Sequence, residues 1–163
     1  MYDLAMEKSV QVEGLKIRCL EEGSGHPVIL LHGASLGSSG DVWEGTVSAL
    51  SRGGFRALAY DQPGFGLSDS PVDYTVSYRT GFIVQFMDAL GISRASLVGH
   101  SQAGGMAARV ALDHPERVSH VVTVATGSLL PPLPDQGGRG GAREGEEGGE
   151  TPPTLEDTKR LLE

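Results

Sequence analysis

A serine at position 101 stands at the junction of two segments with different hydrophobic patterns. Residues 95–98 form a short apolar run of strand length. Beyond the serine, Ala103, Ala107 and Ala111 recur every four residues. This order predicts a buried strand, a sharp turn at Ser101 and an amphipathic helix. A hydroxyl held at such a turn could attack a carbonyl carbon, provided that a base takes its proton.

Small residues flank this serine in the nucleophile-elbow pattern Gly-x-Ser-x-small, with Gly99 before it and Ala103 after it. Small side chains let the strand and the helix approach closely, and the strained turn presents the serine oxygen at the edge of the sheet. The backbone amide of Gln102, at the start of the predicted helix, points where an oxyanion would form. The segment therefore predicts a serine nucleophile with an oxyanion hole beside it.

The elements that must position this turn alternate between strand and helix along the chain. Runs of consecutive apolar residues and helical spacing predict strands at 28–31, 55–60 and 118–125 and helices at 41–51 and 82–90. Asp41 is the expected N-cap of the first helix, and Gly91 is expected to end the second in the left-handed conformation. Such alternation predicts an α/β fold, with a doubly wound, mostly parallel sheet and helices on both faces.

An antiparallel hairpin is predicted at the amino terminus, because residues 10–12 and 15–20 alternate apolar and polar around Gly14. The single cysteine, Cys19, lies on the apolar face of this hairpin and is expected to be a packed thiol. One cysteine also excludes a disulfide within the chain.

Three glycine-rich loops follow the predicted parallel strands. They comprise residues 32–37, residues 61–68 and the turn at Ser101. In a sheet of this kind the ligand lies beyond the carboxyl ends of the strands. We therefore expect the three loops to meet at one site.

Composition limits the classes of function. A chain of 163 residues suits one domain, and its net charge of -8 argues against binding to nucleic acid or to an anionic membrane. No apolar stretch is long enough to span a bilayer, and no signal peptide is visible. No cluster of residues has metal-ligand spacing. We expect a cytoplasmic protein without a metal ion or other cofactor.

Composition also divides the chain. We expect a core at residues 1–127, a flexible linker rich in proline and glycine at 128–153, and the start of a further helix at 154–163. The strand at 118–125 would be an exposed apolar edge, which predicts aggregation or a partner that covers it.

Three segments resemble the α/β-hydrolase superfamily in order and spacing: Leu31-His32-Gly33, residues 61–68 and Gly99–Gly105. The match is to cap-bearing, cofactor-free carbon–carbon bond hydrolases and esterases, with residues 154–163 as the start of the cap helix. The resemblance implies that Ser101 is the nucleophile and that the amides of Gln102 and Ala34 are the oxyanion donors. Epoxide hydrolases and haloalkane dehalogenases have an aspartate where this chain has Ser101.

The resemblance also implies an acid and a histidine on strands that follow the cap, and the 163 residues end before either. We expect the fold to stop after its sixth strand, with base and acid supplied by a carboxyl-terminal part, a second chain or a homo-oligomer. His32 is expected to shape its loop and Asp61 to tie its turn together. His100 is expected to be structural. His26, His114 and His120 are also expected to be structural, with no serine near them. Asp135 is a weaker candidate for the acid.

Two other functions stay open. Because the triad would be incomplete, the chain could be a non-catalytic binding or regulatory module with the same fold. A doubly wound phosphate-binding protein would need a glycine-rich fingerprint after its first parallel strand, and residues 32–37 lack that spacing. The preferred hypothesis is a serine hydrolase acting on a small-molecule carbonyl substrate.

Overall fold

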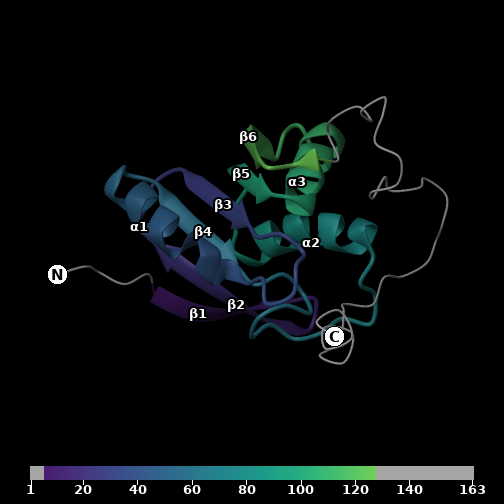
Figure 1. Cartoon of the computed structure of the whole chain (residues 1–163). Helices are drawn as coiled ribbons and strands as arrows, with labels where there is room; N and C mark the ends of the chain where they lie inside the picture. Colours follow the sequence, from purple (N-terminus) through teal and green to yellow (C-terminus); the bar gives the residue numbers. More distant parts are fainter. Residues whose placement is uncertain (1–5, 128–163) are drawn as a thin grey trace.

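Six strands form one sheet in the computed structural model, which describes residues 6–127 (Figure 1). The strands lie in the order β1-β2-β4-β3-β5-β6. The elements are β1 (Met6–Val12), β2 (Leu15–Glu22), β3 (Pro27–Leu31), the 3-10 helix η1 (Gly40–Trp43), α1 (Glu44–Arg52), β4 (Arg56–Tyr60), α2 (Val76–Ala89), β5 (Ala95–His100), α3 (Gln102–Asp113) and β6 (Val118–Val124).

The pairing of the strands confirms the predicted α/β topology. β4, β3, β5 and β6 run parallel to one another, whereas β1 and β2 form the expected antiparallel hairpin. β2 then pairs antiparallel with β4 and so joins the hairpin to the parallel sheet. The carboxyl ends of β3, β4 and β5 therefore lie at one edge, where the three glycine-rich loops begin.

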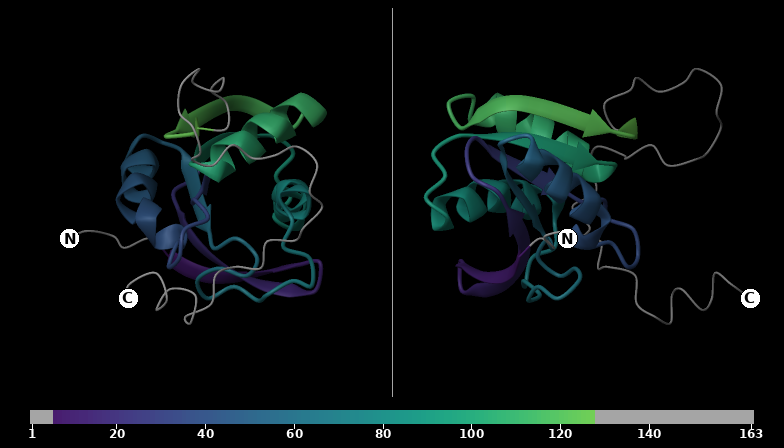
Figure 2. Two further views of the ribbon diagram at one scale, coloured as in Figure 1. Left: turned by 45° about the vertical axis from the view of Figure 1, so that its right-hand side comes forward. Right: turned by 90° about the vertical axis from the view of Figure 1, so that its left-hand side faces the viewer.

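Helices cover both faces of the sheet (Figure 2). α1 packs on one face, where Val47 and the partly buried Trp43 contact residues of β2, β3 and β4. α2 and α3 pack on the other face and form the larger core. Cys19 belongs to that core, and burial raises the pKa of its thiol to about 12, so the expected packed cysteine is observed.

Two helix starts differ from the sequence-based expectation. Asp41 is not the cap of the helix before α1, because Ser39 takes that position and its hydroxyl accepts a hydrogen bond from the Asp41 amide. α2 begins at Val76, six residues before the predicted start, with the Thr75 hydroxyl accepting from the Tyr78 amide. Its first turn carries mostly polar residues, so apolar spacing could not reveal it.

β6 is an edge strand among the described residues, as expected. Val122 and Val124 on this strand are 51% and 40% exposed. That this edge causes aggregation, or that a partner covers it, stays a prediction. The expected linker (128–153), the cap helix (154–163) and Asp135 all lie outside the described residues.

Candidate active site

Ser101 occupies the sharp turn between β5 and α3. Its φ of 56° and ψ of -127° lie in a region that residues with a side chain rarely adopt. Such a conformation costs on the order of 1–3 kcal/mol and is typical of functional sites. The Ser101 amide donates to the Val124 carbonyl of β6 at 2.9 Å, and the side chain is half-buried rather than sealed in the core.

Two glycines allow the strand and the helix to meet at this turn. A Cβ atom on Gly99 would lie 2.5 Å from the carbonyl carbon of Ala103 and 2.6 Å from the Cα of Gly104. A Cβ on Gly104 would overlap the side chain of Thr126. Ala103 is itself buried, so its methyl group fits between helix and sheet. The close approach that the small residues predicted is therefore present.

The loop after β3 packs against Ser101. A Cβ placed on Gly33 would lie 3.3 Å from the Ser101 Cβ and 3.0 Å from Nδ1 of His100. Ala34, the second expected oxyanion donor, follows directly and is half-buried. Ala34 also lines a hollow of about 290 Å³ between the loops after β3 and β4, whose other lining residues include Leu36, Gly64 and Phe65.

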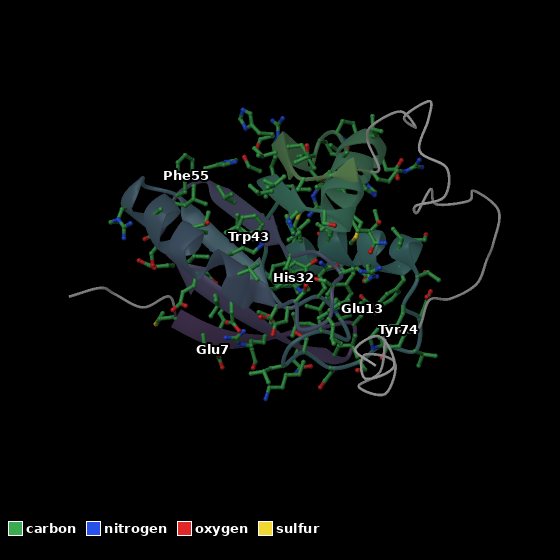
Figure 3. The ribbon with its side chains drawn as sticks, viewed as in Figure 1. Glu7, Glu13, His32, Trp43, Phe55 and Tyr74 are labelled. Carbon is green, nitrogen blue, oxygen red and sulfur yellow. The ribbon has the colours of Figure 1, made fainter. Side chains whose placement is uncertain are left out.

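His32 holds these two loops together from inside (Figure 3). It is fully buried; its Nδ1 donates to the Gly33 carbonyl at 2.7 Å, and its Nε2 accepts from the Gln62 amide at 2.9 Å. The Gln62 side chain donates back to the His32 carbonyl at 2.5 Å. Both ring nitrogens of His32 therefore bond the backbone of the two loops, which is the loop-shaping role that was expected.

Acidification should weaken the protein through His32. Burial lowers the pKa of His32 below its ordinary value of 6.5, so the unfolded chain takes up a proton that the folded chain resists. The contribution of neutral His32 to the free energy of unfolding should be complete above pH 6.5. Below pH 6.5 the free energy of unfolding should fall by up to about 1.4 kcal/mol per pH unit. Urea unfolding at about pH 7.5 and about pH 5.5 measures this.

The control for this prediction is the exposed His114, which ends α3. His32→Gln should flatten the decline of the urea midpoint at acidic pH, whereas His114→Gln should keep the decline of the parent. Equal slopes in the parent and in His32→Gln would contradict the prediction.

Asp61 ties its turn together, as expected. The carboxylate is 1% exposed and accepts from the Gly40 amide at 2.6 Å and the Leu67 amide at 2.9 Å. Nη1 of Arg18 lies 3.4 Å from it. Any side chain on Gly66, whose φ is 53°, would overlap this carboxylate. The two amide contacts hold backbone in place, which is the structural role expected of Asp61.

Two histidines contact serines, contrary to the expectation that no serine lies near them. Nε2 of His26 lies 3.0 Å from the hydroxyl of Ser96 and 2.9 Å from that of Ser119. Nδ1 of His120 lies 3.3 Å from the Ser96 hydroxyl. The pairing of β5 with β6 gathers these residues near the amino end of β5, whereas Ser101 follows its carboxyl end. Within residues 6–127, no histidine ring is hydrogen-bonded to the Ser101 hydroxyl.

The structure adds one residue that the sequence analysis missed. Arg79 of α2 is 7% exposed, and its Nη2 donates to Oε1 of Gln102 at 2.7 Å. Its guanidinium carbon lies 5.7 Å from the centre of the Phe65 ring. An arginine in the polar first turn of a helix gives no sequence signal for such a contact.

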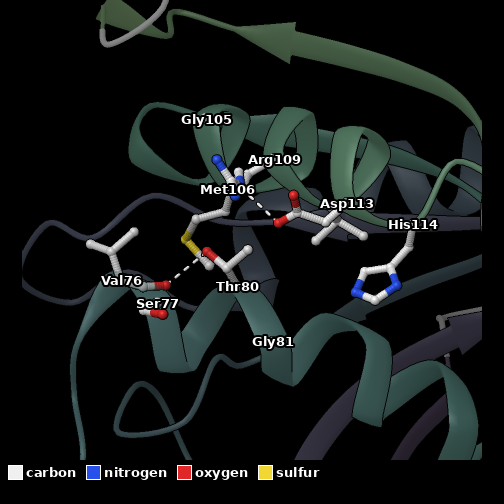
Figure 4. A pocket seen from close by; sticks show the side chains of 10 residues that line it. Val76, Ser77, Thr80, Gly81, Gly105, Met106, Arg109, Asp113 and His114 are labelled. Carbon is white, nitrogen blue, oxygen red and sulfur yellow. Dashed lines mark hydrogen bonds and ion pairs between the residues drawn. The ribbon is translucent and has the colours of Figure 1, made fainter.

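A larger hollow, of about 450 Å³, lies between α2 and α3 (Figure 4). Met106 and the ion pair between Arg109 and Asp113 line it from α3, and Val76 and Thr80 line it from α2. None of the expected site residues lines this hollow. Within residues 6–127 there is no helix long and apolar enough to cross a membrane and no group of three potential metal ligands.

Known proteins match this arrangement. A family model described as the alpha/beta hydrolase fold matches residues 26–138. Bifunctional epoxide hydrolase 2 of Rattus norvegicus is 38% identical over 125 residues, which cover 75% of this chain and 22% of that protein. The 2-hydroxy-6-oxo-6-phenylhexa-2,4-dienoate hydrolase of Burkholderia cepacia is 33% identical over 135 residues, which cover 77% of this chain and 46% of that protein.

Solved structures agree. The crystal structure of a membrane phospholipase A, a bacterial virulence factor, superposes with a TM-score of 0.74 at 33% identity, covering 79% of this chain and 42% of that one. The chain spans less than half the length of these relatives. The matched family model, the sheet order and the strained serine after β5 agree with one another, and the chain belongs to the α/β-hydrolase fold family.

Proposed function

We propose that this chain carries the nucleophile and the oxyanion hole of a serine hydrolase that cleaves an ester or a carbon–carbon bond next to a carbonyl. The observation that supports this most is the backbone of Ser101, held at a φ of 56° between β5 and α3. Nothing in strand or helix formation requires this costly conformation, which is the one expected of a nucleophile elbow.

In the proposed reaction the Ser101 oxygen bonds to the substrate carbonyl carbon while a base takes its proton. The amides of Gln102 and Ala34 donate to the resulting oxyanion. The leaving group departs with a proton as an alcohol or a carbon acid, and water then hydrolyses the acyl-serine and releases an acid. No step needs a cofactor or an oxidant, so none is proposed.

The base and the acid are proposed to come from outside the described residues. Within residues 6–127 no histidine is hydrogen-bonded to Ser101, and the relatives are more than twice as long as the matched segment. A later segment of the same gene product or a second chain would supply them. We also propose that the protein is located in the cytoplasm.

The names of the relatives divide between different substrate classes. One relative is named an epoxide hydrolase, and others are named a dienoate hydrolase and a phospholipase. The resemblance described in the sequence analysis implies an aspartate at the position of Ser101 in epoxide hydrolases. A serine supports acyl transfer from a carbonyl substrate rather than opening of an epoxide.

A fluorophosphonate probe tests the proposal, because it labels only an activated serine. We expect the protein encoded by the natural gene to be labelled at Ser101, as located by mass spectrometry of its peptides, and Ser101→Ala to abolish the label. Ser96→Ala is the matched control, because Ser96 also contacts a histidine but lies at the other end of β5. Absence of label, or label on Ser96, would refute the proposal.

A non-catalytic binding module is the second candidate. It is favoured by the lack of a histidine bonded to Ser101 within residues 6–127. The same probe separates the two functions, since a module without a base would leave Ser101 unlabelled while the fold stays intact by circular dichroism.

A further inference from the structure

A buried cation reaches the first residue of α3 from the neighbouring helix. Arg79 lies in the first turn of α2, and its Nη2 donates to Oε1 of Gln102 at 2.7 Å. A guanidinium loses its hydration when it is buried to 7% exposure, so its hydrogen bonds must compensate. The bond to Gln102 is charge-assisted and is therefore stronger than a bond between neutral groups.

The same guanidinium contacts the loop after β4. Its central carbon lies 5.7 Å from the Phe65 ring centre, within the range of a cation–π contact. Phe65 in turn meets the ring of His32 edge-on, with the ring centres 5.3 Å apart. Arg79 thereby connects α3, which begins directly after Ser101, with the loop after β4 and, through Phe65 and His32, with the loop after β3 that packs against Ser101.

The position of Gln102 gives this connection a consequence for chemistry. The Gln102 amide is joined directly to Ser101, whose φ of 56° stores strain. Rotating the peptide between the two residues would relieve strain and would turn the Gln102 N–H away from the site. A side chain anchored at its far end opposes this rotation, because the residue can no longer turn freely.

We propose that Arg79 is a positioning residue that keeps the Gln102 amide directed at the oxyanion. The inference rests on the proposed function, since the amide matters only if an oxyanion forms. Arg79 itself does not touch the reacting atoms in this account. It acts through the carboxamide of Gln102, and it is held in place by Phe65.

A role in positioning and a role in packing predict different measurements. If Arg79 only joins α2 to α3, its loss lowers the melting temperature and leaves the reactivity of the folded protein unchanged. If it positions the amide, its loss slows the step in which negative charge develops. With a fluorophosphonate probe this step is the maximal inactivation rate, kinact, whereas the half-saturating probe concentration, KI, reports ground-state binding.

The experiment compares variants of the protein encoded by the natural gene. Loss of a whole oxyanion donor lowers rates by about 10²–10³-fold, so a misdirected donor in Arg79→Met should lower kinact by about tenfold or more. KI should change by less than about twofold. Gln102→Ala keeps the backbone amide but removes the anchored oxygen, and it should lower kinact to a similar extent.

Two further variants make the result specific. Arg79→Met combined with Gln102→Ala should be no slower than either single variant, because both remove the same contact. Arg79→Lys should recover part of kinact, since an ammonium group can donate to the same oxygen without the planar fork of arginine. Arg109→Met is the matched control: Arg109 is an exposed arginine of α3 that pairs with Asp113, and its loss should leave kinact unchanged.

The outcomes separate this inference from the proposed function. An unlabelled parent protein would refute the proposed function. A labelled parent with an unchanged kinact in Arg79→Met, or additive losses in the double variant, would overturn the positioning role and leave the hydrolase intact. If Arg79→Met does not fold, Gln102→Ala decides alone: an unchanged kinact there overturns the proposal.

Discussion

Replacing Gly99 with alanine is expected to lower the free energy of unfolding by about 3 kcal/mol or more, or to prevent folding. The new methyl group would lie 2.5 Å from the carbonyl carbon of Ala103 and 2.6 Å from the Cα of Gly104. Both are backbone atoms of α3, so no side chain can move aside to relieve the overlap. α3 would have to shift away from β5, and the turn at Ser101 would shift with it.

The matched control for this prediction is Gly45→Ala in α1. A Cβ on Gly45 meets no atom within 4 Å, and its helical backbone suits alanine, so this variant should gain up to about 1 kcal/mol. Urea unfolding followed by circular dichroism measures both variants. If Gly99→Ala unfolded at the urea midpoint of the parent, the close contact between strand and helix would be wrong.

Asp61→Asn is expected to cost about 3–5 kcal/mol of stability. The buried carboxylate accepts from the amides of Gly40 and Leu67, one on each oxygen, and Arg18 lies beside it. An asparagine would turn its NH2 group toward one of these donors and leave it unpaired. It would also remove the negative charge that faces Arg18.

Asp41→Asn provides the comparison, because Asp41 pairs with the same Arg18 at 2.7 Å but its side chain is 59% exposed. Exposed pairs contribute little, so this variant should lose no more than about 1 kcal/mol. Urea midpoints of the two variants measure the difference. Equal losses of stability in the two variants would show that the buried hydrogen bonds of Asp61 stabilise the fold no more than the exposed ion pair of Asp41.

The sheet could be predicted almost completely from the sequence. The run from Val28 to Leu31 is buried on both faces, as is typical of the middle of a parallel sheet, and the residues of β5 before Ser101 alternate between buried and partly buried. Gly91 could be assigned to the end of a helix because glycine adopts a positive φ readily, and its φ is 64°. Local patterns were sufficient at these positions.

Contacts between distant segments could not be predicted in the same way. His26 meets Ser96 across 70 residues, and Arg79 meets Gln102 across 23. Both contacts depend on how strands and helices align in three dimensions, which apolar spacing does not encode. The capping hydroxyl of Ser39 was missed for a different reason, since Asp41 two residues later is an equally good cap by type.

The amino-terminal hairpin has a part in the site although it carries no candidate catalytic group. The part of β2 that precedes its pairing with β4 bonds the loop that holds Asp61: the amides of Lys16 and Arg18 donate to the side chains of Asp69 and Ser68. The Asp69 amide donates back to the Lys16 carbonyl. The hairpin thus acts as a template for the shape of a candidate-site loop that lies about fifty residues later in the chain.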